Sequence, residues 1–223
     1  MPLVMVDTNF SLRATIPRPG GLARKAWVLF AFGAAQLRAE QLELDFAELN
    51  GEAARSGGRL SRSESLFTAS AAELARLEEL LPIGTPTDWA LAGSQACWDE
   101  YQRKALELAS RLHRSITPRQ AGLLRQQYEA LCVVAPKPSY ALQVPALTPD
   151  PDDDLLVFDA MRVGADIFVS DDPHVIPADA DGAIDYEFGE LSVRAMTPGY
   201  FFDQIGNEVD WDSIDGSWIR PST

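Results

Sequence analysis

The chain has few of the side chains that build disulfide frameworks or transition-metal centres, with two cysteines and two histidines among 223 residues. Cys97 and Cys132 lie far apart and form no CxxC pair, so the sequence predicts neither a disulfide framework nor a zinc site. This cysteine usage favours a reducing, cytoplasmic compartment. Two histidines, His113 and His174, are too few for a histidine-rich zinc or iron site.

Basic residues are also scarce: 19 lysines and arginines face 33 acids, which gives a net charge of −14. Tight, general binding to nucleic acid normally needs lysine and arginine against phosphate, so the composition argues against it. It does not argue against a nuclease that holds cations and contacts its substrate locally. The basic residues nearest the amino-terminal end, Arg13, Arg18, Arg24 and Lys25, are candidate phosphate contacts or, more simply, a solvated loop and helix start.

Long apolar runs are missing as well. The longest apolar segment, AWVLFAFGAAQL at 26–37, is too short to span a bilayer and too late for a signal peptide, so no membrane association is expected. A hydrophobic content of 46% with 23% charged residues predicts a globular chain with one sizeable core.

Strand and helix patterns alternate along the chain. Short apolar runs predict strands at 3–6, 89–94, 131–134, 166–172 and about 190–196, and Pro- and Gly-bearing residues 11–21 predict a loop. Helical spacing of apolar residues lies between these strands, as in QACWDEYQRKALELASRLH and DDLLVFDAMRVGA. This alternation predicts an α/β fold with βαβ units and a parallel sheet.

Carboxylates recur where this sheet would place a ligand. Asp7 ends the first strand, Asp172 ends a later one, and Asp154 opens the helix between. Ligands bind outside the carboxyl ends of parallel strands, and clustered carboxylates without basic partners are unfavourable unless a cation lies between them. Mg²⁺ or Mn²⁺ suits such oxygen ligands. The alternative is structural: aspartates often cap helices or begin turns, as we expect of Asp152 and Asp153.

Three segments together resemble one known family. MVDTNF, DPDDDLLVFDAMRVGADIFVSDDPHVI and GELSVRAMTPGYFF are similar to the motifs of the PIN domain, a nuclease family that includes many toxins of bacterial toxin–antitoxin pairs. The resemblance covers roughly the first 35 residues and residues 85–202. It implies a three-layer α/β/α fold around a central parallel sheet, in a domain over 1–205. The segment 38–85 is then a helical insertion, and 206–223 is an acidic tail.

The resemblance also implies a site. Asp7, Glu100, Asp154 and Asp172 would hold Mg²⁺ or Mn²⁺ and act as the catalytic set of an endoribonuclease, with Asp99 as the rival of Glu100. Asp171 is a further candidate metal ligand, although its charge would also repel a substrate phosphate. Asn9 and Ser170 are candidate substrate contacts, whereas His174 is expected to be a surface or capping residue.

The same resemblance implies partners and leaves alternatives open. A toxin would meet RNA and a small antitoxin, and homodimerisation would use helices between residues 22 and 130. The second hypothesis is a non-catalytic module on the same fold that binds a cation or a basic protein partner, which the net charge favours. A third, a phosphoacceptor receiver domain, lacks the lysine that it requires at a strand end.

Overall fold

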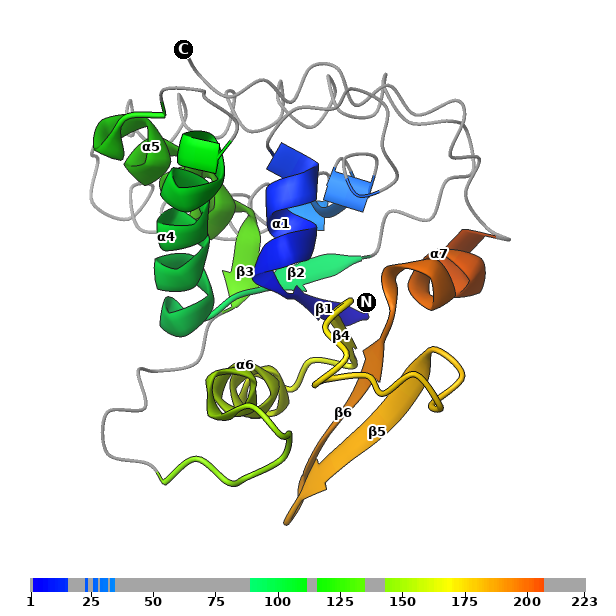
Figure 1. Cartoon of the computed structure of the whole chain (residues 1–223). Coiled ribbons are helices and arrows are strands. Elements are labelled where there is room, and N and C mark those ends of the chain that lie inside the picture. The colour runs from blue at the N-terminus through cyan, green and yellow to red at the C-terminus, as the bar shows by residue number, and fades with distance from the viewer. Residues whose placement is uncertain are drawn as a thin grey trace, which may run out of the picture.

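A computed structural model describes residues 2–15, 23, 26–27, 29–31, 33–34, 89–111, 116–134 and 143–206 (Figure 1). The predicted insertion at 38–85 and the acidic tail from residue 207 onward lie outside the described residues. None of the described helices combines the length and the apolar character that crossing a bilayer requires.

The described strands form one six-stranded sheet in the order β3-β2-β1-β4-β6-β5. The strands are β1 (Leu3–Val6), β2 (Ala90–Ala92), β3 (Cys132–Val134), β4 (Ile167–Val169), β5 (Ala183–Phe188) and β6 (Leu191–Met196). Every pairing is parallel except that of β5 with β6. The prediction of an α/β fold with a mostly parallel sheet is therefore confirmed at this level.

The described helices are α1 (Thr8–Thr15), α4 (Gln95–Arg111), α5 (Pro118–Leu131), α6 (Pro151–Arg162) and α7 (Pro198–Gly206). In Figure 1, α1, α4 and α5 gather beside β1, β2 and β3, and α6 lies beside β6. The sequence predicted a loop from Ser11 onward. This is wrong for residues 11–15, which belong to α1. Asp7 caps this helix: its Oδ1 accepts a hydrogen bond from Phe10 N (2.9 Å), which satisfies a backbone donor of the first turn.

The carboxyl-terminal part of the sheet is a hairpin that the sequence analysis missed. Only one strand was expected there, but β5 precedes β6 and pairs antiparallel with it, with Phe188 opposite Leu191. Gly189 has φ of 64°, a left-handed conformation that favours glycine in a two-residue hairpin turn. The alternation in β5 is weak because a single residue, Tyr186, is buried.

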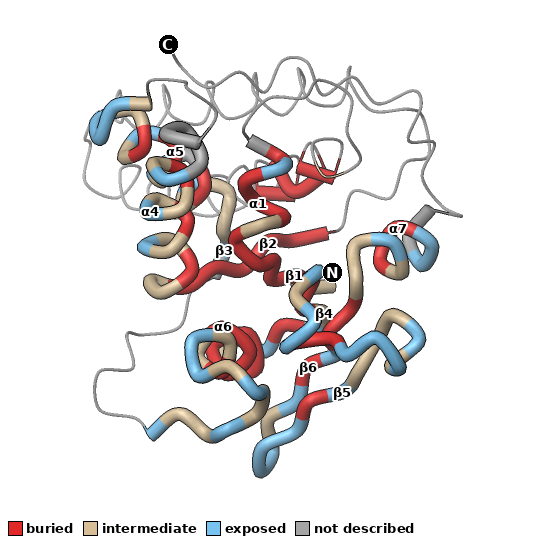
Figure 2. Tube along the Cα trace, in the orientation of Figure 1, coloured by how far each residue is buried: buried red, intermediate tan, exposed pale blue. Residues whose placement is uncertain are grey.

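The core lies around β1, whose Val4, Met5 and Val6 are fully buried. Trp27, Tyr101 and Tyr128 are among the largest buried side chains, and the Trp27 and Tyr128 rings lie 5.2 Å apart between centroids. The Tyr128 hydroxyl donates to the carbonyl of Val6 (3.3 Å), so α5 is tied to the last residue of β1. Figure 2 shows this buried centre in red. The end of β1 is therefore held in place from several sides.

The side chains around Gly93, which follows β2, are tightly packed. A Cβ at this position would lie 2.6 Å from Trp98 Nε1 and 2.7 Å from Cys132 Sγ. We expect Gly93→Ala to lower the free energy of unfolding by about 1–3 kcal/mol, measured by urea denaturation, because the indole must shift. Gly122→Ala in α5 is the control. A Cβ there meets nothing within 4 Å, so that variant should match or exceed the wild type.

Candidate functional site

The carboxyl ends of β1 and β4 lie side by side. Val6 pairs with Val169, and Asp7 N donates to the carbonyl of Val169 (2.9 Å), so the residues that follow the two strands are adjacent. Ser170 Oγ then donates to Asp7 Oδ2 (2.5 Å). The backbone N–H of Asp172 donates to the same Ser170 oxygen (3.1 Å). The predicted approach of Asp7 and the 170–172 segment is therefore present, and Ser170 joins the two.

Asp7 is a buried carboxyl, only 6% exposed. Burial raises its pKa, and the charge of Asp171 adds to this rise. The hydrogen bonds from Ser170 and Phe10 act in the opposite direction without cancelling it. A carboxylate in this position is costly to ionise unless a cation approaches it.

Ser170 itself is fully buried. Its hydroxyl is therefore occupied in positioning Asp7 and Asp172, which does not fit the predicted substrate contact. Asn9, the other predicted contact, lies partly exposed in the first turn of α1.

Glu100, rather than its neighbour Asp99, faces this part of the sheet. Thr8 Oγ1 donates to Glu100 Oε2 (2.6 Å), which brings the α4 carboxylate beside the residue that follows Asp7. Asp99 instead accepts from Arg125 (2.6 Å) and is 56% exposed. The structure thus separates the two rivals by direction: Glu100 points toward β1, and Asp99 points toward α5.

Asp154, a predicted metal ligand, is engaged by the chain that precedes α6. Its Oδ1 accepts three hydrogen bonds from the preceding loop: Leu147 N (2.8 Å), Thr148 N (2.6 Å) and Thr148 Oγ1 (3.0 Å). Asp150 caps α6 by accepting from Asp152 N (3.0 Å). These contacts make Asp154 an anchor of the 147–150 loop.

Asp153, which the sequence analysis took for a surface acid or cap, is the α6 acid that faces the other carboxylates. Its Oδ2 is buried and accepts no hydrogen bond from the residues that the structure describes. Burial raises its pKa to about 6, and the charges of Asp172, Asp150 and Glu100 contribute to the rise. Asp153 shares a helix face with the buried Leu156, Val157 and Ala160, at spacings of three, four and seven residues. Asp154 has the same spacing to the buried Val157, Phe158 and Met161, so the sequence pattern does not choose between the two acids.

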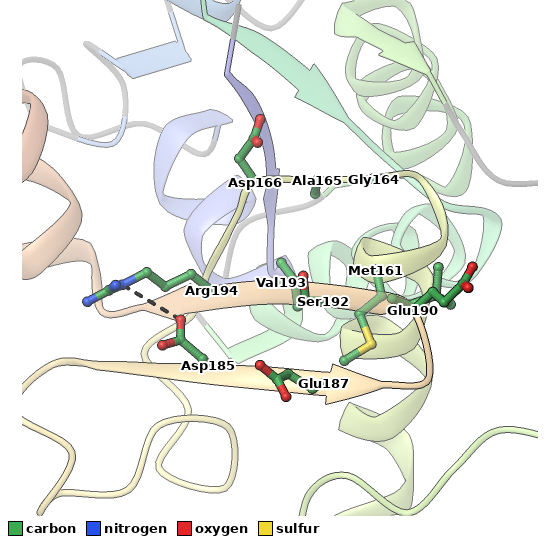
Figure 3. Close-up of a pocket in the computed structure, with 11 residues that line it drawn as sticks. Met161, Gly164, Ala165, Asp166, Asp185, Glu187, Glu190, Ser192, Val193 and Arg194 are labelled. Atoms are coloured by element: carbon green, nitrogen blue, oxygen red, sulfur yellow. Dashed lines mark ion pairs between the residues drawn. The ribbon is translucent and has the colours of Figure 1, made fainter.

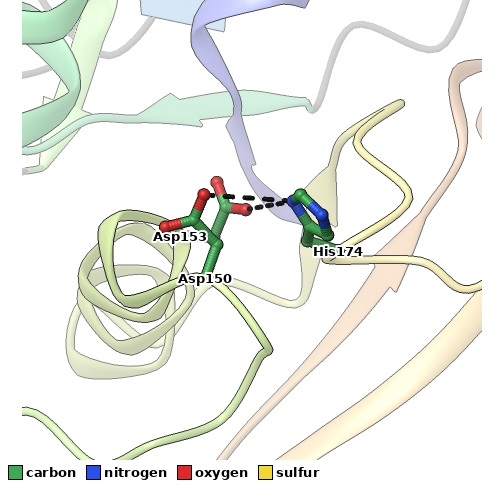
Figure 4. A group of neighbouring side chains, drawn as sticks. All are labelled: Asp150, Asp153 and His174. Carbon is green, nitrogen blue, oxygen red and sulfur yellow. Dashed lines mark ion pairs between the residues drawn. The ribbon is translucent and has the colours of Figure 1, made fainter.

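Asp172 and His174 complete the acidic edge, and Figure 4 shows the His174 ring facing Asp150 and Asp153. Asp172 Oδ1 accepts from His174 N (2.9 Å) and lies 3.3 Å from His174 Nδ1. The same ring nitrogen is 3.9 Å from both Asp150 Oδ2 and Asp153 Oδ2. Within the described residues, Asp150, Asp153 and His174 offer ligand atoms that all lie within 4.8 Å of one another. The set Asp7, Glu100, Asp154 and Asp172 does not meet that spacing.

Basic side chains of α1 and α4 border the site, among them Arg103, whose Nη2 lies 3.7 Å from Glu100 Oε1. Arg13 is ion-paired with Asp171, so the Asp171 carboxylate is engaged by α1. Lys104 Nζ lies 2.8 Å from Glu100 Oε1. Burial lowers the pKa of Lys104, but its hydrogen bond with Glu100 and the charges of Glu100 and Asp7 outweigh burial and raise it. Lys104 is therefore a fixed positive charge next to two of the acids.

Compared with family models, with curated proteins and with solved structures, the chain shows no match in any of the three. The resemblance to the PIN domain stays a prediction. The fold and the site define an α/β protein with a mostly parallel sheet, in which acidic side chains gather at the carboxyl-terminal ends of β1 and β4. Its function has to be argued from that edge.

The neighbours Asp153 and Asp154 should respond in opposite directions to substitution. At pH 7.5 in EDTA, we expect Asp153→Asn to raise the free energy of unfolding by about 1–2 kcal/mol, because an ionised carboxylate is removed from a repulsive, largely buried position. Asp154→Ala should lower it by about 1–3 kcal/mol, because part-buried donors lose their acceptor. Chemical denaturation of both variants measures the two effects.

Lowering the pH supplies the control for this pair. The folded-state pKa of Asp153 lies above the ordinary value of 3.8, so the wild type loses stability as pH rises from 3.8 to about 6. The advantage of Asp153→Asn should be complete above that range and absent below it. Exposed Asp152→Asn should stay within about 0.5 kcal/mol of wild type. An Asp153→Asn advantage that persists at pH 3.5 would contradict the assignment.

Proposed function

We propose that the chain is a divalent-cation-dependent phosphodiester hydrolase that acts on RNA, on a PIN-like scaffold. The observation that carries this proposal is the buried Oδ2 of Asp153, which accepts no hydrogen bond from the described residues and lies in the field of Asp172, Asp150 and Glu100. A buried carboxylate oxygen that accepts no hydrogen bond from the described residues, and has an exposed imidazole 3.9 Å away, is what a metal ligand looks like before it is loaded. Acids from four separate segments meet at this edge, which random surface charge does not explain.

The donor set fits a hard divalent cation. Carboxylate oxygens are the ligands that Mg²⁺ and Mn²⁺ prefer, and the exposed imidazole of His174 adds one nitrogen at the rim. In this proposal, Asp153 and Asp172 hold the ion, and Asp7 and Glu100 complete the negative field. When bound, the ion would supply a hydroxide from water at neutral pH and offset charge on the phosphate oxygens. Asp153 replaces Asp154 in the ligand set first predicted.

The chain's own residues supply the rest of the chemistry. Ser170 holds Asp7 through a 2.5 Å hydrogen bond, and Thr8 holds Glu100 through one of 2.6 Å, so both carboxylates are oriented before substrate arrives. Arg13 is 58% exposed and can exchange Asp171 for a substrate phosphate. Because the chain carries −14 charges, such local contacts have to overcome long-range repulsion of RNA.

A second candidate function has an observation of its own. Lys104 pairs with Glu100, and Arg13 pairs with Asp171, so two acids of the edge already have internal counter-charges. A non-catalytic module that binds one cation, or a basic protein partner, needs no more than this. A toxin role, an antitoxin partner and a homodimer follow from the resemblance alone.

Cleavage of a fluorogenic single-stranded RNA tests the nuclease proposal. We expect turnover in Mn²⁺ and in Mg²⁺, none in EDTA, and losses of at least 10- to 100-fold in Asp153→Asn and Asp172→Asn. Asp152→Asn, one residue from Asp153 and exposed, should keep wild-type activity.

Thermal unfolding with and without millimolar Mn²⁺ separates the two candidate functions. A metal-dependent rise in Tm that Asp153→Asn removes, without any cleavage, would select the binding module. If Tm does not respond to either ion, the shared metal site is wrong for both functions.

A further inference from the structure

Strand β5 forms one edge of the sheet. It follows β6 in the strand order and, within the described part of the chain, has no other strand neighbour. Figure 1 shows it at the outer end of the sheet, and Figure 2 shows it largely exposed. An uncovered edge of six residues is a template for pairing with another strand.

The hairpin register fixes which backbone groups are free for such pairing. Thr197 N donates to the carbonyl of Gly182 (2.8 Å), so residues 182, 184, 186 and 188 exchange their hydrogen bonds with β6. Ala183, Asp185 and Glu187 therefore turn their N–H and C=O groups away from β6. Ala183 N is used by a local bond to Ala180 O. The N–H and C=O groups of Asp185 and Glu187 remain as the outward ladder.

One face of the hairpin is acidic. Asp185 and Glu187 line a cavity of about 490 Å³ together with Asp166 and Glu190, and Arg194 is the single basic residue among its lining side chains (Figure 3). Arg194 Nε lies 3.9 Å from Asp185 Oδ1, which neutralises one acid in part. The surplus of negative charge beside the free edge favours a basic occupant.

The opposite face of β5 is apolar. Ile184, Tyr186 and Phe188 alternate with the two acids, as the two-residue period of a strand requires. Tyr186 is buried and its hydroxyl donates to the carbonyl of Val175 (2.5 Å). Phe188 packs edge-on against Phe158 yet is 48% exposed, the most exposed large hydrophobic residue described. A strand that paired with β5 would cover it.

We propose that β5 is a docking edge for an extended segment of another protein in which basic and apolar residues alternate. The segment pairs with the outward N–H and C=O groups of Asp185 and Glu187. Its lysines or arginines lie beside the two acids and reach the cavity, and its apolar residues cover Phe188.

Charge selects this occupant over a second copy of the chain. Antiparallel pairing of two β5 strands would place Asp185 and Glu187 of one copy near those of the other, and like charges across strands are destabilising. RNA is disfavoured for the same reason. The inference goes beyond the proposed hydrolase and does not rest on it, since β5 lies at the edge of the sheet and the metal site at the ends of β1 and β4.

A labelled peptide that alternates lysine and valine over nine residues is the probe, with fluorescence anisotropy of the full chain as the measurement. We expect saturable binding at 50 mM salt, weaker binding at higher salt, and none for the matching glutamate–valine peptide. The double variant Asp185→Lys/Glu187→Lys should weaken binding at least about tenfold. Glu107→Lys/Asp203→Lys changes net charge equally on α4 and α7 and should bind as wild type.

Backbone pairing is tested on the peptide, so that the protein stays unchanged. Methylating alternate peptide nitrogens blocks hydrogen bonding on one side only. One register of methylation should abolish binding, and the other should leave it within about twofold. Equal loss in both registers, or equal loss in the two double variants, would show charge adsorption and overturn the proposal. So would a dimer in sedimentation that Asp185→Lys/Glu187→Lys dissociates.

Discussion

The parallel pairing of β1 with β4 is the contact on which the rest of the site depends. It sets Asp7 beside Ser170, and the 2.5 Å hydrogen bond between their side chains then fixes a buried carboxylate at the edge of the sheet. Thr8, the residue after Asp7, donates a hydrogen bond to Glu100, and the backbone N–H of Asp172 donates to Ser170. The negative charge at this edge therefore comes first from residues that directly follow the strands. Helices α4 and α6 add the carboxylates of Glu100 and Asp153 to it.

The sequence was sufficient for the parts of the fold that follow from local pattern. β1 is found where its apolar run predicted, because Val4, Met5 and Val6 are buried on both faces of a parallel sheet. β5 was missed because its alternation is almost hidden: one residue of six is buried, and two of the others are acids. α1 was missed because proline and glycine beyond Thr15 dominated the pattern, although Asp7 provides a cap.

The site shows where pattern reasoning stops. The strand-end position of Asp7 and Asp172 was readable, since parallel strands end at a common edge. The contrast between Asp153 and Asp154 could not be read from the sequence, because it depends on how α6 is rotated against the sheet. Adjacent helical residues point about 100° apart. One of them meets the other acids, and its neighbour meets the 147–148 backbone.

The cap on α1 has a thermodynamic consequence. Asp7 Oδ1 accepts a hydrogen bond from Phe10 N in the first turn of α1, and Oδ2 accepts one from Ser170. Both oxygens therefore take part in folded-state contacts. A cation that binds Asp7 draws electron density from the oxygens that accept these two hydrogen bonds and so weakens them. Cation occupancy and the order of the helix start are then linked functions. The amide of Phe10 then becomes a reporter: its exchange with solvent should change whenever the acidic edge is filled.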